Sequence, residues 1–302
     1  GYSTIGESVF IEIEGQESGE RDIAKKTGGI ISQLPDGATY QPVKEKYLMI
    51  QDPGAVNGYR SYIIDDAGTV VWGSAAEVSL SNNNDNILSP HILLRTDDAT
   101  GVLFLEDMSF SGFIWENTFA YGISSDEGSV SEELLVLKDL SGMYSVLNAE
   151  GVIVSGLPYQ PYVTPESYVL ANVASYNTTY HGFELQSFDK NGTAAWPEGT
   201  YFSHSIINNF PGNTDYLYGI IVYTSDGFGY MAPDGHTIVT PENKDLIVLQ
   251  PEPLLLAKTE ADTSQLINAT SGSIIAEVQK TNYGEISAEI DNSAIRFRNA
   301  IE

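Results

Sequence analysis

A short turn closed by glycine, between two apolar runs, returns seven times in this chain of 302 residues. Successive turn glycines lie 37 to 44 residues apart. They are Gly28, Gly68, Gly112, Gly151, Gly192, Gly235 and Gly272. A fixed period in this range is typical of repeat architectures, in which each small unit packs mainly on its neighbours. This period constrains the fold more than any local pattern in the sequence does.

Each repeat carries three short runs rich in Val, Ile, Tyr and Phe, which favour strands. In the third copy we expect strands over residues 91–96, 102–106 and 113–115, with the glycine turn between the second and third. The first copy is weaker, because residues 21–25 fit either a strand or a helical turn. Apolar spacing of three and four residues is not sustained, so helix is scarce. The glycines should adopt positive φ, which lets a tight hairpin re-enter the sheet.

These repeats predict an all-β fold, a seven-bladed β-propeller built from antiparallel repeats of about 41 residues. The whole chain, 1–302, is expected to be a single propeller domain. The expected blades cover residues 8–45, 46–89, 90–131, 132–166, 167–214, 215–252 and 253–302. One of two late runs, 285–290 or 294–298, is expected to complete a terminal blade, and residues 79–86 read as a polar loop. The alternative is a pair of β-sandwich domains, whose turns would be less regularly spaced.

A pattern of Asp, Gly and Trp occurs twice, from Asp65 to Trp72 and from Asp189 to Trp196, and Trp115 sits one residue closer to its glycine. This pattern resembles the tryptophan-docking repeat of quinoprotein-type bacterial propellers. The resemblance implies a fold in which the tryptophans dock one blade on the next, and it implies no activity. A quinone-dependent dehydrogenase would need a metal and commonly a vicinal cysteine pair. The chain has no cysteine, so this activity is not expected.

The charge balance of 14 basic against 41 acidic residues gives a net charge of −27 and a pI near 4.2. Such a field repels phosphate backbones and anionic membranes, so nucleic acid is not an expected partner. The lack of cysteine excludes disulfides and thiolate sites. No run approaches the length of a transmembrane helix. We expect an acidic, exported protein, extracellular or anchored at the cell envelope, whose targeting signal lies outside this chain.

No catalytic motif is present: the sequence lacks a Gly-x-Ser-x-Gly elbow, a phosphate loop and a His-Glu-x-x-His pair. Four histidines fall in different copies without paired spacing, so no metal site and no cofactor are expected. They are His91, His181, His204 and His236. Calcium is an open alternative, because it takes oxygen ligands from loops and many aspartates stand at turns. These are Asp65, Asp66, Asp97, Asp98, Asp139, Asp189 and Asp234.

One segment, 156–165, combines prolines with tyrosines. Prolines stiffen the backbone, so tyrosines presented there would bind a protein or a sugar at low entropic cost. The candidate ligand-binding residues are Tyr159, Tyr162 and Tyr168. A stiff connection between blades is the simpler interpretation of this segment.

The function expected from these features is that of a monomeric, non-catalytic propeller that binds a protein or carbohydrate ligand through one face. The alternative is a carbohydrate-active hydrolase or lyase with carboxylates around a channel, although the sequence selects no catalytic pair. A purely structural spacer is a third reading.

Overall fold

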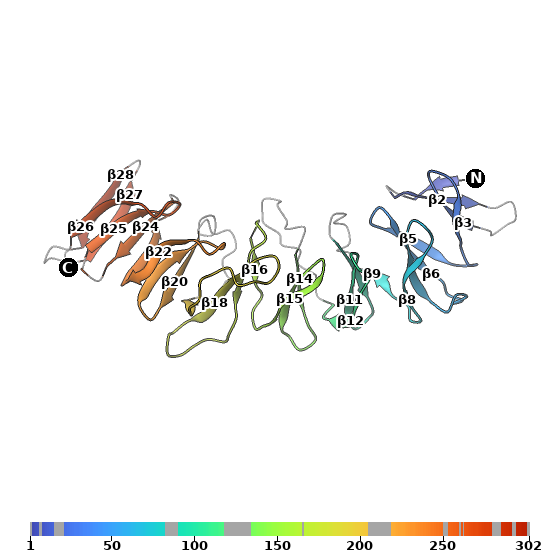
Figure 1. Cartoon of the computed structure of the whole chain (residues 1–302), viewed down its shortest axis with the longest axis horizontal. Helices are drawn as coiled ribbons and strands as arrows, with labels where there is room; N and C mark the ends of the chain where they lie inside the picture. Colours follow the sequence, from blue (N-terminus) through green and yellow to red (C-terminus); the bar gives the residue numbers. More distant parts are fainter. Residues whose placement is uncertain are drawn as a thin grey trace. The chain divides into compact units, whose positions relative to one another are not determined.

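The computed structural model describes residues 2–5, 8–14, 21–81, 90–117, 134–164, 166–204, 219–249, 253–259, 261, 263–279, 285–291 and 294–300. These residues form antiparallel strands and turns, with no helix among them (Figure 1). A membrane-spanning helix is therefore not found in this part of the chain. The expectation of an all-β chain is confirmed at this level.

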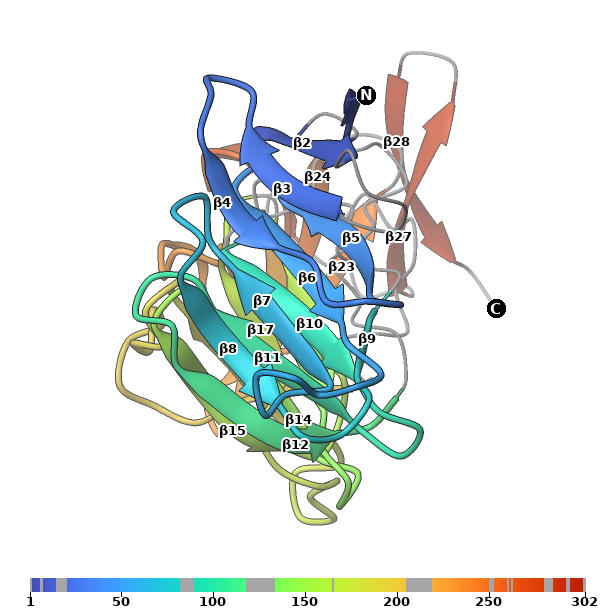
Figure 2. The same ribbon diagram turned by 90° about the vertical axis from the view of Figure 1, so that its right-hand side faces the viewer.

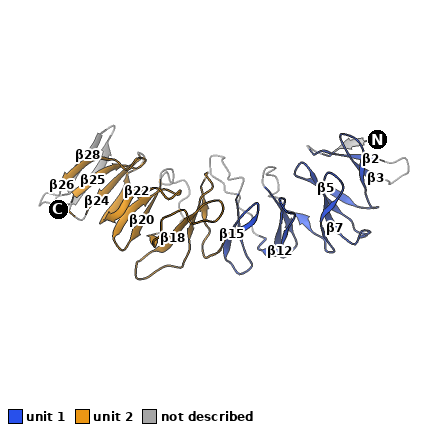
Figure 3. Ribbon diagram, viewed as in Figure 1, with its two compact units in different colours: residues 1–122, 132–152 blue, residues 123–131, 153–302 orange. Residues whose placement is uncertain are grey.

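The chain divides into two compact units, which are coloured separately in Figure 3. Unit 1 contains residues 1–122 and 132–152, and unit 2 contains residues 123–131 and 153–302. Each unit contains several copies of the repeat, and each is described by itself below.

Unit 1 begins with two four-stranded sheets (Figure 2). The first contains β1 (Tyr2–Thr4), β2 (Phe10–Glu14), β3 (Arg21–Lys25) and β4 (Ile30–Gln33). The second contains β5 (Thr39–Val43), β6 (Tyr47–Gln51), β7 (Ser61–Ile64) and β8 (Val70–Ser74). The weak run at 21–25 is a strand, paired with β2 over its whole length.

The third sheet contains β9 (Ser79–Leu80), β10 (His91–Arg95), β11 (Thr100–Phe104) and β12 (Phe110–Trp115). A sheet of three described strands follows: β13 (Leu135–Lys138), β14 (Tyr144–Asn148) and β15 (Gly151–Leu157), of which β15 belongs to unit 2 from Ile153 onward. The inner strands β7, β10 and β11 are almost wholly buried, because sheets cover both of their faces. This explains why they read as continuous apolar runs rather than as alternating ones.

Unit 2 contains a sheet of seven described strands in chain order. They are β16 (Tyr162–Val163), β17 (Val169–Asn172), β18 (Phe183–Phe188), β19 (Tyr201–Ser203), β20 (Ile220–Thr224), β21 (Gly227–Met231) and β22 (Thr237–Asn243). Strands β19 and β20 are joined by one pair, Phe202 with Tyr223. Through this pair, two repeats that the glycine period separates, 167–214 and 215–252, belong to one sheet.

A four-stranded sheet follows in unit 2, formed by β23 (Asp245–Leu249), β24 (Leu254–Lys258), β25 (Thr263–Asn268) and β26 (Ile274–Gln279). The last strands, β27 (Glu285–Asp291) and β28 (Ala294–Ala300), pair only with each other among the described strands. We expected one of them to complete a terminal blade, and the structure differs. They form a separate hairpin, because only two residues separate two runs of equal length.

The core is a series of apolar clusters, each formed by consecutive sheets or, in the seven-stranded sheet of unit 2, by consecutive repeats of one sheet. In unit 1, Phe10 and Ile23 of the first sheet pack with Leu48 of the second. The second sheet packs on the third, and the third on the fourth, in the same manner. In unit 2, Leu185 packs with Val222 in one cluster, and Tyr230 with Leu255 in the next. Each repeat thus buries apolar surface against the next one, which is the physical basis of the repeat.

The four-stranded sheets begin one strand earlier than the repeats inferred from the sequence. The expected bounds at 45/46, 89/90 and 252/253 fall between the first and second strands of a sheet, after β5, β9 and β23. The glycine turn consequently joins the third and fourth strands, not the second and third. The first strands β5 and β9 escape a search for apolar runs because they are partly exposed, and β5 also contains Pro42, which an edge strand tolerates.

The seven glycines all have positive φ, from +69° at Gly272 to +141° at Gly151, as predicted, but Gly112 lies inside β12 and not in a turn between strands. Four of them also approach the preceding repeat so closely that a Cβ atom would overlap a backbone carbonyl oxygen there. The pairs are Gly68 with Ile31, Gly192 with Ile153, Gly235 with Ala195, and Gly272 with Ile238. Each carbonyl lies two or three residues after the preceding turn glycine. The glycine period therefore reflects a close contact between successive repeats as well as the need for positive φ.

One expected strand does not form. Residues 193–196 were expected to follow the fifth glycine turn as a strand, but only Ala194 bridges to Phe188. Instead, Tyr201–Ser203 forms β19, which pairs with β18. Pro197 explains the break, because proline has no N–H to donate and restricts the residue before it.

Candidate functional site: a tyrosine pocket in unit 2

Four aromatic rings of unit 2 stack in a row, and we call them the aromatic stack. Tyr180 lies on Phe202 with ring centroids 4.4 Å apart and planes 19° apart. Phe202 lies on Tyr223 at 5.6 Å, and Tyr223 on His204 at 4.6 Å. Phe202 is buried, whereas Tyr180 is 43% exposed. The row thus holds an exposed tyrosine ring against a rigid aromatic support.

The loop between β17 and β18 positions Tyr180. The side chain of Asn177 accepts hydrogen bonds from the backbone N–H groups of Thr179 and Tyr180, at 2.9 and 3.1 Å. The Tyr223 hydroxyl donates a bond to the Tyr180 carbonyl at 2.7 Å. Gly182 is required at the base of this loop, because a Cβ atom there would overlap the Tyr223 hydroxyl. The loop is therefore tied to strand β20.

Burial, and then the neighbouring hydroxyl of Tyr176, raise the pKa of Tyr223. The hydroxyl therefore remains protonated and able to donate at physiological pH. Tyr176 is itself 47% exposed and contacts Phe183 edge-on at 5.2 Å. The loop thus presents two exposed tyrosines, Tyr176 and Tyr180.

A hollow of about 440 Å³ lies beside the stack, and we call it the tyrosine pocket. It is bounded by the loop of Tyr180, the segment leading into β19, and the turn between β20 and β21. Its lining residues are Tyr180, Glu198, Gly199, Thr200, Tyr201, Phe202, Thr224, Ser225, Asp226 and Pro241. The pocket combines an aromatic wall with hydroxyl and carboxylate groups, the mixture that ligand sites use to orient a bound molecule.

Both carboxylates of the pocket, Glu198 and Asp226, are exposed to solvent. Asp226 accepts a hydrogen bond from Ser225 Oγ at 3.2 Å, and its backbone N–H donates to Thr224 Oγ1. Among the described residues, the pocket lining contains no lysine, arginine or histidine. Its electrostatic character is therefore negative.

The three tyrosines selected from the sequence have different surroundings. Tyr159 contacts Phe183 edge-on at 5.3 Å, and so belongs to the same aromatic surface as Tyr176. Tyr162 packs against a core cluster, and burial, followed by the charge of Glu166, raises its pKa. Tyr168 is half-buried, and its backbone closes a turn with Thr164. A binding role for these three residues stays a prediction.

Sequence reasoning missed Tyr176, Tyr180 and Phe202. The signal that could have found the loop is its composition, since Tyr176 and Tyr180 flank an Asn-Thr-Thr turn just before Gly182. No sequence signal brings Phe202 to Tyr180, because their meeting depends on the pairing of β18 with β19.

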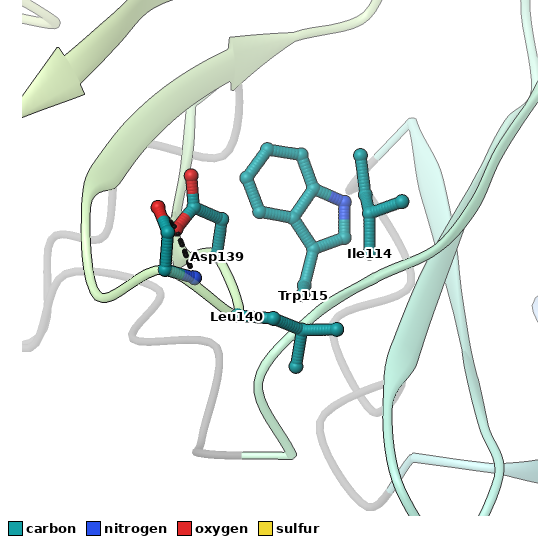
Figure 4. A pocket seen from close by; sticks show the side chains of 5 residues that line it. Ile114, Trp115, Asp139 and Leu140 are labelled. Carbon is teal, nitrogen blue, oxygen red and sulfur yellow. Dashed lines mark hydrogen bonds between the residues drawn. The ribbon is translucent and has the colours of Figure 1, made fainter.

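Unit 1 has a second hollow, of about 370 Å³. Figure 4 shows the Trp115 indole between the side chains of Ile114 and Asp139, with Leu140 in front. Ile114 and Leu140 are 48% and 59% exposed, so the rim is apolar. Asp139 is already engaged by the N–H and hydroxyl of Ser141, and these hydrogen bonds, led by the hydroxyl, lower its pKa. The hollow offers few polar groups to orient a ligand.

The three tryptophans are buried in clusters between consecutive sheets. Trp196 Nε1 donates to the Ala232 carbonyl, three residues before the next turn glycine, at 2.9 Å. Trp115 Nε1 is buried and finds no partner among the described residues. The Asn148 carbonyl is the equivalent of the Ala232 carbonyl, because it also lies three residues before a turn glycine. It lies 2.7 Å from His91 Nε2 instead of bonding to Trp115. Because a carbonyl only accepts, His91 Nε2 carries the proton.

Among the described residues, no three histidine, aspartate or glutamate side chains converge as a metal site would require. The turn aspartates Asp65, Asp139 and Asp189 each accept two or more backbone N–H groups of their own turns. Turn formation thus accounts for these three residues.

Comparisons with known proteins were made for the whole chain. No protein-family model and no curated protein matches the sequence. Solved structures that resemble it include the computationally designed Ika8 protein, at 10% identity and a TM-score of 0.27, covering 96% of this chain and 90% of that one. BamB from Moraxella catarrhalis has 10% identity and a TM-score of 0.23, with 97% and 77% covered. AztD from Citrobacter koseri has 11% identity and a TM-score of 0.26, with 95% and 87% covered. TM-scores this low carry no argument, so the inferences below rest on the chain's own geometry.

Proposed function

We propose that the chain is an exported, non-catalytic binding protein that holds a carbohydrate ligand in the tyrosine pocket. The observation that supports this proposal is the exposed ring of Tyr180, stacked on Phe202 and tied by its carbonyl to Tyr223. A flat ring held in place can cover the C–H face of a sugar at little entropic cost. The hydroxyls of Thr200, Thr224 and Ser225 line the same hollow and can bond to sugar hydroxyls.

The scaffold for this site is proposed to be a single seven-bladed propeller. Its support is the run of sheets that bury apolar surface only against their neighbours, and the glycine contacts that repeat from one sheet to the next. Propellers solve the same burial problem by repetition. The acidic composition supports export, because a high net charge keeps an exported protein soluble.

A hydrolase or lyase is the second candidate, because Glu198 and Asp226 line one pocket. Both are exposed, whereas a carboxyl that acts as a general acid usually sits in an apolar environment that keeps it protonated. Binding without turnover is therefore the better supported function.

The test is a binding screen with neutral and charged oligosaccharides, followed by titration calorimetry of the best ligand. Tyr180→Ala should weaken binding about tenfold, since a stacked ring contributes roughly 1 kcal/mol beyond the area it covers. Tyr59→Ala is the matched control, because Tyr59 is similarly exposed at 39% but lies in unit 1. Equal affinities in the two variants would contradict the proposed site. Release of new reducing ends by the wild type, but not by Glu198→Gln, would favour the hydrolase.

A further inference from the structure

We propose that the tyrosine pocket selects a sugar that carries an ammonium group, such as an unacetylated amino sugar. This inference rests on the proposed function, because it specifies the ligand of the same pocket. It starts from the charge of the lining: Glu198 and Asp226 supply two carboxylates, and none of the lining residues that the structure describes is cationic.

Glu198 has no hydrogen bond or ion pair to another described residue, so its carboxylate is open to a ligand. Asp226 accepts one bond, from Ser225 Oγ, and has acceptor capacity left. Each carboxylate is exposed, and an exposed ion pair changes affinity by about fivefold at most. Two such carboxylates would give a preference of about tenfold for a cationic ligand.

Tyr180 adds to this preference, because an ammonium group near the face of an aromatic ring is attracted by the ring's negative face. Anionic sugars are disfavoured for the opposite reason. The two pocket carboxylates and the net charge of −27 both repel uronic acids and sulfated chains.

A lysine-rich peptide also carries ammonium groups, but the rest of the pocket fits a sugar better. Thr200, Thr224 and Ser225 place three hydroxyls beside the aromatic wall. A pyranose ring has both an apolar face for Tyr180 and hydroxyls for these side chains. A lysine side chain has an ammonium group and an alkyl stem, and would leave the three hydroxyls without partners.

The test compares glucosamine and N-acetylglucosamine oligomers of equal length by calorimetry, in mildly acidic buffer where the free amine is protonated. We expect the glucosamine oligomer to bind about tenfold more tightly, with a preference that falls as salt is added. The double variant Glu198→Gln, Asp226→Asn should abolish the preference, so that the two oligomers bind it with equal affinity. Glu77→Gln, Glu150→Gln is the control, because it removes the same charge from two exposed residues of unit 1.

The outcomes separate the two proposals. Binding of both oligomers with equal affinity, lost in Tyr180→Ala, would overturn the ammonium preference and leave carbohydrate binding intact. A lysine peptide that binds as tightly as the amino sugar, and depends equally on Tyr180, would overturn the sugar assignment. A preference that changes by the same factor in the pocket variant and in the unit 1 control would assign it to overall charge and overturn the inference. Failure of every oligosaccharide to bind would remove the proposed function itself.

Discussion

The contact between successive repeats can be tested with two glycines of unit 1 that differ in only one respect. Gly68, between β7 and β8, has φ +81°, and Gly58, in the loop before β7, has φ +82°. A Cβ atom at Gly68 would overlap the Ile31 carbonyl oxygen in β4, whereas at Gly58 it would meet nothing within 4 Å. Alanine at either position suffers the same backbone strain, and only alanine at Gly68 disturbs the neighbouring sheet.

The magnitudes follow from these two terms. The left-handed conformation costs a non-glycine residue about 1–2 kcal/mol, and this is the whole expected cost of Gly58→Ala. Forcing an added methyl group into a packed site costs about 1–3 kcal/mol more. We therefore expect Gly68→Ala to lower the free energy of unfolding of unit 1 by about 2–5 kcal/mol.

The assay is urea unfolding in which hydrogen–deuterium exchange is the readout. Exchange is measured on peptides from β4, β7 and β8, so that it reports on this part of unit 1 alone. Gly68→Ala should also reduce protection in β4, the strand whose carbonyl the new methyl group meets, while Gly58→Ala should leave β4 unchanged. If the two variants differ by less than about 0.5 kcal/mol, the size of an ordinary surface effect, the close approach of the repeats is refuted.

Two further predictions concern the buried rings. Trp196→Phe should lower the free energy of unfolding by about 1 kcal/mol more than Trp115→Phe, because only Trp196 loses a hydrogen bond; equal urea midpoints would contradict this. Burial lowers the pKa of His91 below 6.5, against the opposing hydrogen bond to Asn148 and with a smaller contribution from Lys44. The unfolded chain therefore takes up the proton first, so unit 1 should lose stability as pH falls below about 6.5 and show no such dependence above it. His91→Gln should flatten the pH dependence of the urea midpoint, and an unchanged slope would exclude His91 as its source.

Much of the fold could be predicted from local sequence because the requirements behind it are local. A turn that needs positive φ selects glycine within a few residues, and a strand covered on both faces selects a continuous apolar run, as in β10 and β11. The partly exposed first strands carry neither signal, so the expected repeats begin one strand late. Trp196 belongs to an apolar run that predicts a strand, but Pro197 directly after it prevents the strand from forming.

The sequence by itself determined the repeat, its glycine turns and the inner strands of each sheet, because each depends on the conformation or burial of neighbouring residues. Only the tertiary structure decided the ligand site. Tyr180, Phe202 and Tyr223 come from a loop and two strands, and they meet because β18 pairs with β19 and β19 with β20. The sequence period does not predict this contact. Stacking across strands depends on the strand register, and on Gly182, which leaves room for the Tyr223 hydroxyl.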